Sequence, residues 1–201
     1  MKPWMHQKEI DMVLSYLTNS TDKIMLEWGS GGSTLLFSQH VKKYYSIEHN
    51  LDWYYEVRNK LVSDDINNVV HHLNDYPKGR SEVYDTFFKK WEELILQVSG
   101  ETTNNYFGIK EYPNPKEMYI WYDYVNVIDK FNEPHFDFVF IDGRARVNCA
   151  YKALKYIDEN SIIFIHDFYK KEELPDVLEF YEIIDSVEDT LQTIAVLKKK
   201  I

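Results

Sequence analysis

Two hydrophobic spacings alternate along the chain, and they predict helices and strands in turn. A helix-spaced apolar stripe comes first, at Ile10, Val13, Leu14 and Leu17. Short apolar runs then predict strands at 24–26, 44–47 and 68–73. Stretches with helical periodicity separate these strands, at 33–41 and 51–62. The order β-α-β-α-β indicates a parallel sheet covered by helices on both faces.

The second half of the chain continues the pattern and then breaks it. Strands are predicted at 136–141 and 161–165, with a helix between them whose apolar face carries Val147, Ala150, Tyr151 and Leu154. Only Val187-Glu188-Asp189 separates the last two runs, 182–186 and 190–197, which suits a hairpin and not a helical crossover. The predicted fold is therefore α/β: a doubly wound, mostly parallel, seven-stranded sheet that ends in an antiparallel hairpin.

Residues 76–134 form an aromatic-rich insert between the third and fourth strands. The insert is about 29% of the chain and holds 13 of its 32 aromatic residues. A crossover needs only about a dozen residues, so the excess predicts further helices at 82–98 and 117–130, joined by a loop at 100–115. The insert is either a lid that binds a ligand at the edge of the sheet or an extension of the core. We expect a single domain over residues 1–201 with the insert as its lid.

Composition narrows the class of protein. A chain of 201 residues with 44% hydrophobic residues can bury one core, and it has no apolar run that could span a bilayer. The first eight residues lack the apolar stretch of a secretion signal, and the lone Cys149 has no internal partner, so we expect a cytoplasmic protein without a membrane partner. A net charge of −10 argues against a nucleic-acid partner, and the basic end at 198–200 is interpreted as a solvated tail.

The segment Glu27-Trp28-Gly29-Ser30-Gly31-Gly32-Ser33-Thr34 links the first strand to the next helix through a glycine turn. Glycines let a ligand approach the backbone, so the turn indicates a nucleotide-like cofactor. In the dinucleotide pattern G-x-G-x-x-G the third glycine would fall at Thr34, which weakens an NAD interpretation. Glu27 would repel a pyrophosphate but could pair with the cationic methionine end of S-adenosylmethionine. The turn therefore favours S-adenosylmethionine as the cofactor.

Polar residues also follow the other predicted strands: Glu48, Asp142 and the pair His166-Asp167. With the glycine turn, this pattern resembles the class I S-adenosylmethionine-dependent methyltransferases over nearly the whole chain. The resemblance implies that Gly29 and Gly31 cradle the methionine part and that Glu48 accepts hydrogen bonds from the ribose hydroxyls. Asn74-Asp75 follows the third strand, where it either binds the adenine edge or only forms a turn. The expected donor-binding residues are Glu27, Gly29, Ser30, Gly31, Ser33, Thr34, Glu48, His49, Asn74, Asp75 and Asp142.

Two strand-end motifs, Ile141-Asp142-Gly143-Arg144 and Ile165-His166-Asp167-Phe168, resemble those of cation-dependent O-methyltransferases that act on sugars. Those enzymes carry Asp-Gly-Asp and Asp-Asp-Tyr. The resemblance implies that Asp142, His166 and Asp167 are catalytic and hold Mg²⁺ or Mn²⁺, which would activate the acceptor hydroxyl. Arg144 and His166 depart from the family pattern, and an imidazole ligand would shift the preference from Mg²⁺ towards Mn²⁺.

Other roles for these residues stay open. Without a metal, His166 would be the general base, oriented by Asp142 or Asp167, or it would simply be a buried histidine. Arg144 and Arg146 either bind an anionic acceptor or neutralise the nearby acids. The sequence thus predicts an O-methyltransferase for a small acceptor, a sugar or glycan, with phenols and other small alcohols as further possibilities. A non-catalytic binding module and an NAD-linked enzyme are the alternatives.

Overall fold

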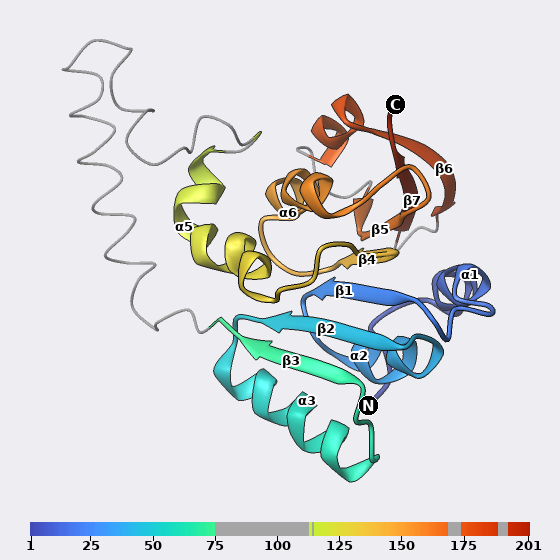
Figure 1. The fold of residues 1–201 in the computed structure, drawn as a ribbon, viewed down its shortest axis with the longest axis vertical. Helices are drawn as coiled ribbons and strands as arrows, with labels where there is room; N and C mark the ends of the chain where they lie inside the picture. Colours follow the sequence, from blue (N-terminus) through green and yellow to red (C-terminus); the bar gives the residue numbers. More distant parts are fainter. Residues whose placement is uncertain (75–112, 114, 169–173, 189–192) are drawn as a thin grey trace, which may run out of the picture.

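A computed structural model describes residues 1–74, 113, 115–168, 174–188 and 193–201, and seven strands among them form one sheet (Figure 1). The strands are β1 (Ile24–Trp28), β2 (Lys43–Glu48), β3 (Val69–Leu73), β4 (Phe138–Ile141), β5 (Ile162–His166), β6 (Tyr181–Glu188) and β7 (Thr193–Lys199). Their spatial order is β3-β2-β1-β4-β5-β7-β6, with β7 antiparallel to both of its neighbours and the other pairs parallel. The predicted α/β sheet with a C-terminal antiparallel hairpin is confirmed.

Helices cover both faces of the sheet (Figure 1). One face carries α1 (Gln7–Tyr16), α2 (Gly32–Phe37), which a 3-10 turn η1 (Ser38–His40) extends, and α3 (Leu51–Ser63). The other face carries α5 (Pro115–Asn126) with η4 (Val127–Lys130), and α6 (Arg146–Ala153) with η5 (Leu154–Tyr156). A further 3-10 segment, η7 (Leu174–Glu179), precedes β6. The predicted helix at 33–41 is thus a shorter α-helix that tightens into a 3-10 turn.

Side chains of successive strand residues point to opposite faces, so each central strand feeds two apolar layers. On β1, Met25 packs with Phe37 and Val13 beneath α1 and α2, whereas Leu26 and Trp28 pack in the layer beneath α5 and α6. Both layers are fully buried at these positions. This explains why the strands are continuous apolar runs in the sequence and not alternating ones.

The strand order reverses at β1, which pairs with β2 on one side and β4 on the other. Trp28 lies opposite Ile141 in register, so the glycine turn after β1 and Asp142 after β4 are neighbours. Open α/β sheets bind ligands at such a point, outside the carboxyl ends of the strands. The fold therefore places the predicted strand-end residues along one edge.

Part of the insert is described. The predicted helix at 117–130 is found as α5 and η4, and its buried residues Tyr124, Val125, Val127 and Ile128 belong to the core. This part of the insert extends the core. Val187 and Glu188, predicted to form the hairpin turn, belong to β6. Several predictions fall outside the described residues: the helix at 82–98, almost all of the loop at 100–115, Asp75 and the residues at 189–192. The lid function therefore stays a prediction. No helix of the described part of the chain is long and apolar enough to cross a membrane.

Candidate active site

A cavity of about 950 Å³ opens at the carboxyl ends of β1, β2, β4 and β5. Its walls come from the glycine turn, the end of β2, the first turns of α3, the segments after β4 and β5, and the N-terminal segment. The lining residues are 2–5, 29–33, 48–50, 52, 53, 56, 142–144, 146, 166 and 167. Most of the predicted site residues therefore meet at one cavity, and residues 2–5 are a wall that the sequence did not predict.

The three glycines of the turn differ in whether the structure leaves room for a side chain at their position. Gly29 has a φ of +97°, and a Cβ there would lie 2.6 Å from the backbone nitrogen of Gly143, so only glycine fits where the two turns touch. At Gly32 a Cβ would lie 2.2 Å from the carbonyl carbon of Lys2, because the N-terminal segment rests on this residue. Gly31 has extended backbone, and a Cβ there would meet nothing closer than Trp53, 3.9 Å away. The fold does not require glycine at Gly31, which leaves its backbone open to the cavity.

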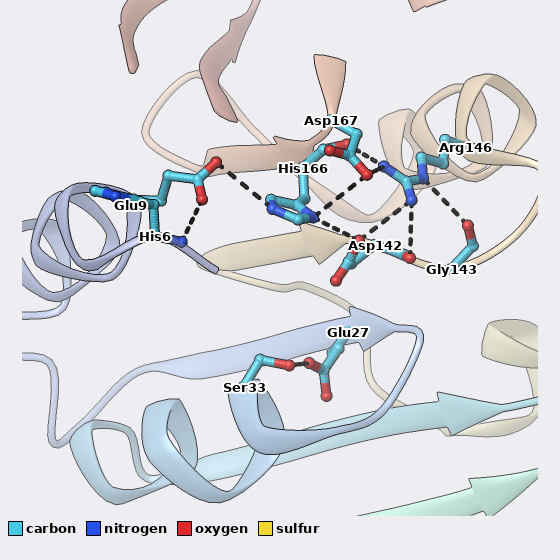
Figure 2. A network of polar contacts seen from close by, with 9 residues as sticks. All are labelled: His6, Glu9, Glu27, Ser33, Asp142, Gly143, Arg146, His166 and Asp167. Atoms are coloured by element: carbon cyan, nitrogen blue, oxygen red, sulfur yellow. Dashed lines mark hydrogen bonds and ion pairs between the residues drawn. The ribbon is translucent and has the colours of Figure 1, made fainter. Parts of the chain in front are cut away.

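Glu27 lies beneath the turn and not on the cavity wall. Its carboxylate is fully buried and accepts a hydrogen bond from the Ser33 hydroxyl at 2.5 Å (Figure 2). It also accepts from the hydroxyls of Thr34, at 2.5 Å, and Ser46, at 2.7 Å. Burial raises the pKa of Glu27 to about 7, although these three hydroxyls oppose the rise. The expectation that Glu27 contacts a donor directly is therefore corrected: this residue ties α2 to β1 and β2.

The other polar residues of the turn serve different purposes. Thr34 is fully buried, and its hydroxyl oxygen accepts the backbone N–H of Gly31 at 2.9 Å, so it organises the turn from within. Ser33 and Ser30 both line the cavity, and their role in donor binding stays a prediction. Trp53 closes the turn from the α3 side, where its indole N–H donates to the carbonyl of Ser30 at 2.7 Å.

Glu48 presents an ionised carboxylate at the end of β2. One oxygen accepts the backbone N–H groups of His49 and Asn50 at 2.8 Å each, and the other accepts the N–H and hydroxyl of Ser30 at 3.2 and 3.1 Å. Burial alone would raise the pKa of Glu48, but the hydrogen bonds from His49 and Asn50 hold it below the usual value. The imidazole of His49 also lies 3.1 Å from this carboxylate, and the rotatable Ser30 hydroxyl is a partner that a ligand hydroxyl can replace.

Of the two residues predicted to bind the adenine edge or to form a turn, the structure describes Asn74 but not Asp75. Asn74 donates its backbone N–H to the carbonyl of Glu48 at 2.7 Å and does not line the cavity, which agrees with its role as a turn residue. Two tryptophans that the sequence did not predict lie at the cavity. Trp53 lines the cavity beside Gly31, and Trp4, 85% exposed, has its ring 6.4 Å from that of Trp53.

Asp142, His166 and Asp167 meet as predicted (Figure 2). The Nδ1 atom of His166 lies 2.8 Å from Oδ1 of Asp142 and 3.8 Å from Oδ2 of Asp167. His166 is almost fully buried. Burial lowers the pKa of His166, but the hydrogen bond with Asp142 and the nearby carboxylates of Glu9 in α1 and Asp167 outweigh it and raise the pKa to about 9.

Arg146 completes the cluster from the start of α6. Its guanidinium lies 3.2 Å from Oδ1 of Asp142 and 3.7 Å from Oδ2 of Asp167, and it also donates to the backbone carbonyls of Asp142, Gly143 and His166. Of the two roles left open for this arginine, neutralisation of the acids is the one the structure shows. Arg144 is exposed on the cavity wall.

The cluster does not fit a resident divalent cation. Ligand atoms of Asp142, His166 and Asp167 lie within 4.8 Å of one another, close enough for a metal site. However, Asp142 and His166 are hydrogen-bonded to each other, and the guanidinium of Arg146 sits against both carboxylates. Arg146 and His166 offset the negative charge of the two neighbouring carboxylates.

Known proteins resemble this chain in structure only. No family model matches the sequence, and no curated protein matches it. A putative methyltransferase from Streptococcus mutans, in complex with SAH, superposes with a TM-score of 0.58 at 12% identity over 98% of this chain and 100% of that one. A methyltransferase-like protein from Silicibacter pomeroyi gives 0.60 at 17% identity, over 99% of this chain and 89% of that one. A putative caffeoyl-CoA O-methyltransferase from Staphylococcus aureus gives 0.62 at 11% identity, over 98% and 86%.

These similarities define the class of fold. The chain has the class I, Rossmann-like methyltransferase fold, with its cavity at the strand edge where the order of the sheet reverses. At such low identities the likeness establishes the fold alone, so activity and acceptor have to be argued from the site itself.

Proposed function

We propose that this protein is an S-adenosylmethionine-dependent methyltransferase that methylates a hydroxyl of a small acceptor, a sugar or glycan. The observation that carries the proposal is the arrangement of the cavity. It joins the open backbone at Gly31, the ionised Glu48 and the acid cluster at Asp142 in one space at the switch point of the sheet. A neighbour of the same fold holds SAH, which supports the donor assignment.

The donor side of the cavity fits S-adenosylmethionine. Gly31 offers backbone without a side chain, and Glu48 offers a carboxylate whose Ser30 hydroxyl partner a ribose diol can replace. The NAD alternative is weaker, because the third glycine of its fingerprint is Thr34, whose side chain is fully buried in the Glu27 network. When bound, S-adenosylmethionine supplies an electrophilic methyl group on a positively charged sulfur.

The residues on the other side of the cavity align the acceptor and take up its proton. Methyl transfer requires alignment of the acceptor oxygen and removal of one proton. The side chain of Asp142 is 26% exposed and lines the cavity, whereas that of His166 is only 5% exposed. We assign Asp142 as the group that accepts the hydroxyl proton, with His166 and Arg146 holding its carboxylate in place.

The lining also suits a neutral, sugar-like acceptor. Five acids line the cavity, Glu48, Asp52, Glu56, Asp142 and Asp167, against Lys2, Arg144, Arg146 and the protonated ring of His166. This balance disfavours a highly anionic acceptor. The rings of Trp4 and Trp53 supply an aromatic surface at the mouth, and aromatic faces stack on the C–H edges of sugars.

Calorimetry with S-adenosylmethionine, SAH and NAD tests the donor assignment. We expect heat with the first two, and a loss of roughly 1–3 kcal/mol of binding free energy in Glu48→Ala, the usual range for hydrogen bonds to a charged acceptor. Glu159→Ala is the control, because this exposed acid precedes β5 at the opposite edge of the sheet. Binding of NAD alone would show that the donor assignment is wrong.

Turnover is tested separately, by release of SAH from S-adenosylmethionine with a panel of sugars, phenols and small alcohols. Methylation of sugars supports the full proposal, and methylation of phenols alone corrects the acceptor. Donor binding without turnover on any member would favour the alternative of a non-catalytic binding module.

A further inference from the structure

Glu9 is a buried carboxylate that the donor and acceptor assignments leave without a role. It lies in the first turn of α1, is 0% exposed, and points from the N-terminal helix towards the end of β5 (Figure 2). Burying an ionised carboxylate is costly unless it is paired and hydrogen-bonded. The question is therefore what compensates it.

One oxygen of Glu9 has a local partner. Oε2 accepts the backbone N–H of His6 at 2.7 Å, an interaction that caps α1 and fixes the rotation of the carboxylate. The other oxygen, Oε1, is then directed at His166 and lies 3.5 Å from its Nε2 atom. Among the described residues neither Oε1 of Glu9 nor Nε2 of His166 has a hydrogen-bond partner of ordinary geometry.

A single proton on Nε2 of His166 gives this atom and Oε1 of Glu9 a partner in each other. If Nε2 of His166 carries a hydrogen, it points at Oε1 of Glu9, and the other ring nitrogen, Nδ1, donates to Asp142 at 2.8 Å. The imidazole then lies between two carboxylates with both nitrogens protonated. A neutral ring would leave either Asp142 or Glu9 facing a lone pair, which burial makes unfavourable.

We propose that Glu9 is a positioning residue, which holds His166 as an imidazolium between two carboxylates so that Asp142 is the fixed proton acceptor of the site. His166 then acts as a clamp and not as the general base. The catalytic part of this inference rests on the proposed methyltransferase function, but the arrangement of the three side chains does not.

The charged groups that face His166 come from four elements. They are Glu9 of α1, Asp142 after β4, Asp167 after β5 and, through the two aspartates, Arg146 of α6. Glu9 is the member of this set that the N-terminal helix contributes. Because residues 2–5 lead directly into α1 and also wall the cavity, the same contact anchors that wall.

The test compares Glu9→Gln with Asp11→Asn in the full chain. Both changes neutralise one acid on α1, but Asp11 is exposed. Nitrogen NMR of the free protein reports the pKa of His166. We expect Glu9→Gln to lower it by about 1–3, the range for losing an adjacent opposite charge, and Asp11→Asn to leave it unchanged. This readout requires neither donor nor acceptor.

Kinetics supply the second readout. Glu9→Gln is expected to lower kcat at least ~10-fold, because Asp142 loses its fixed position, while KM for the donor stays within ~2-fold. Glu9→Asp keeps the charge and should recover part of both effects, which also covers a Gln variant that fails to fold. An unchanged His166 pKa in folded Glu9→Gln overturns the proposal. A lowered pKa in a protein without methyl transfer leaves Glu9 as the holder of His166 but refutes the proposed function.

Discussion

Replacing Glu27 by Gln tests the central electrostatic feature of the glycine turn. The carboxylate is fully buried, and burial raises its pKa from the ordinary 4.5 to about 7. The folded state therefore binds more protons than the unfolded state between these two values. The stability of the wild-type protein should fall as pH rises through this window, and the whole cost is present above pH 7.

The size of the effect follows from the two pKa values. A tenfold change in proton affinity corresponds to about 1.4 kcal/mol, so the difference between 4.5 and about 7 corresponds to about 3 kcal/mol. Gln has the shape of Glu without its charge, and the rotatable hydroxyls of Ser33, Thr34 and Ser46 can donate to its oxygen or accept from its amide. We expect Glu27→Gln to match the wild type near pH 5 and to exceed it by up to about 3 kcal/mol at pH 8.

Urea unfolding at pH 5, 6, 7 and 8 measures this difference in free energy, provided that both proteins unfold reversibly in two states. Glu56→Gln, the same change on the exposed surface of α3, is the control and should stay within about 0.5 kcal/mol of the wild type. A Glu27→Gln variant that is less stable at every pH would refute the reasoning. It would show that the three hydroxyls hold the charged carboxylate more strongly than burial disfavours it.

Four further outcomes are expected. Gly31→Val should fold like the wild type, because Gly31 has extended backbone and room for a Cβ, but it should abolish donor binding. Gly29→Val should lower the melting temperature, because Gly29 has a φ of +97°. Asp142→Asn should lower turnover at least ~10²-fold with donor affinity almost unchanged, and EDTA should leave wild-type turnover intact because Arg146 already neutralises the acids. Mg²⁺-dependent recovery after EDTA would reinstate the predicted metal site.

The fold was predictable because the helices carry apolar stripes at helical spacing and the strands between them are short apolar runs. The strand-end residues were predictable too, since parallel strands of one sheet end at the same edge. Glu27 was assigned to the wrong side, although the alternation along β1 held a signal: Met25 and Glu27 share the face that α2 covers. Counting alternate positions back from the end of β1 would have predicted that the carboxylate of Glu27 points away from the ligand.

Other features of the site leave no local trace in the sequence. Glu9 and His166 are separated by most of the chain, and an acid in the first turn of a helix normally reads as a favourable charge at the helix start. Arg146 could be linked to the acids only as one of two alternatives, because its contacts depend on how α6 begins. The wall formed by residues 2–5 depends on the packing of that segment against Gly32, which no periodic pattern encodes.

The order of the last two strands has a consequence for how the chain is made. β6 is synthesised before β7 but pairs with the sheet only through β7, which lies between β5 and β6 (Figure 1). On the ribosome, the edge of β5 beside His166 therefore stays unpaired until β7 has emerged. A chain cut before β7 would lose two strands and not one, and it would expose a sheet edge on which other unfinished chains can pair.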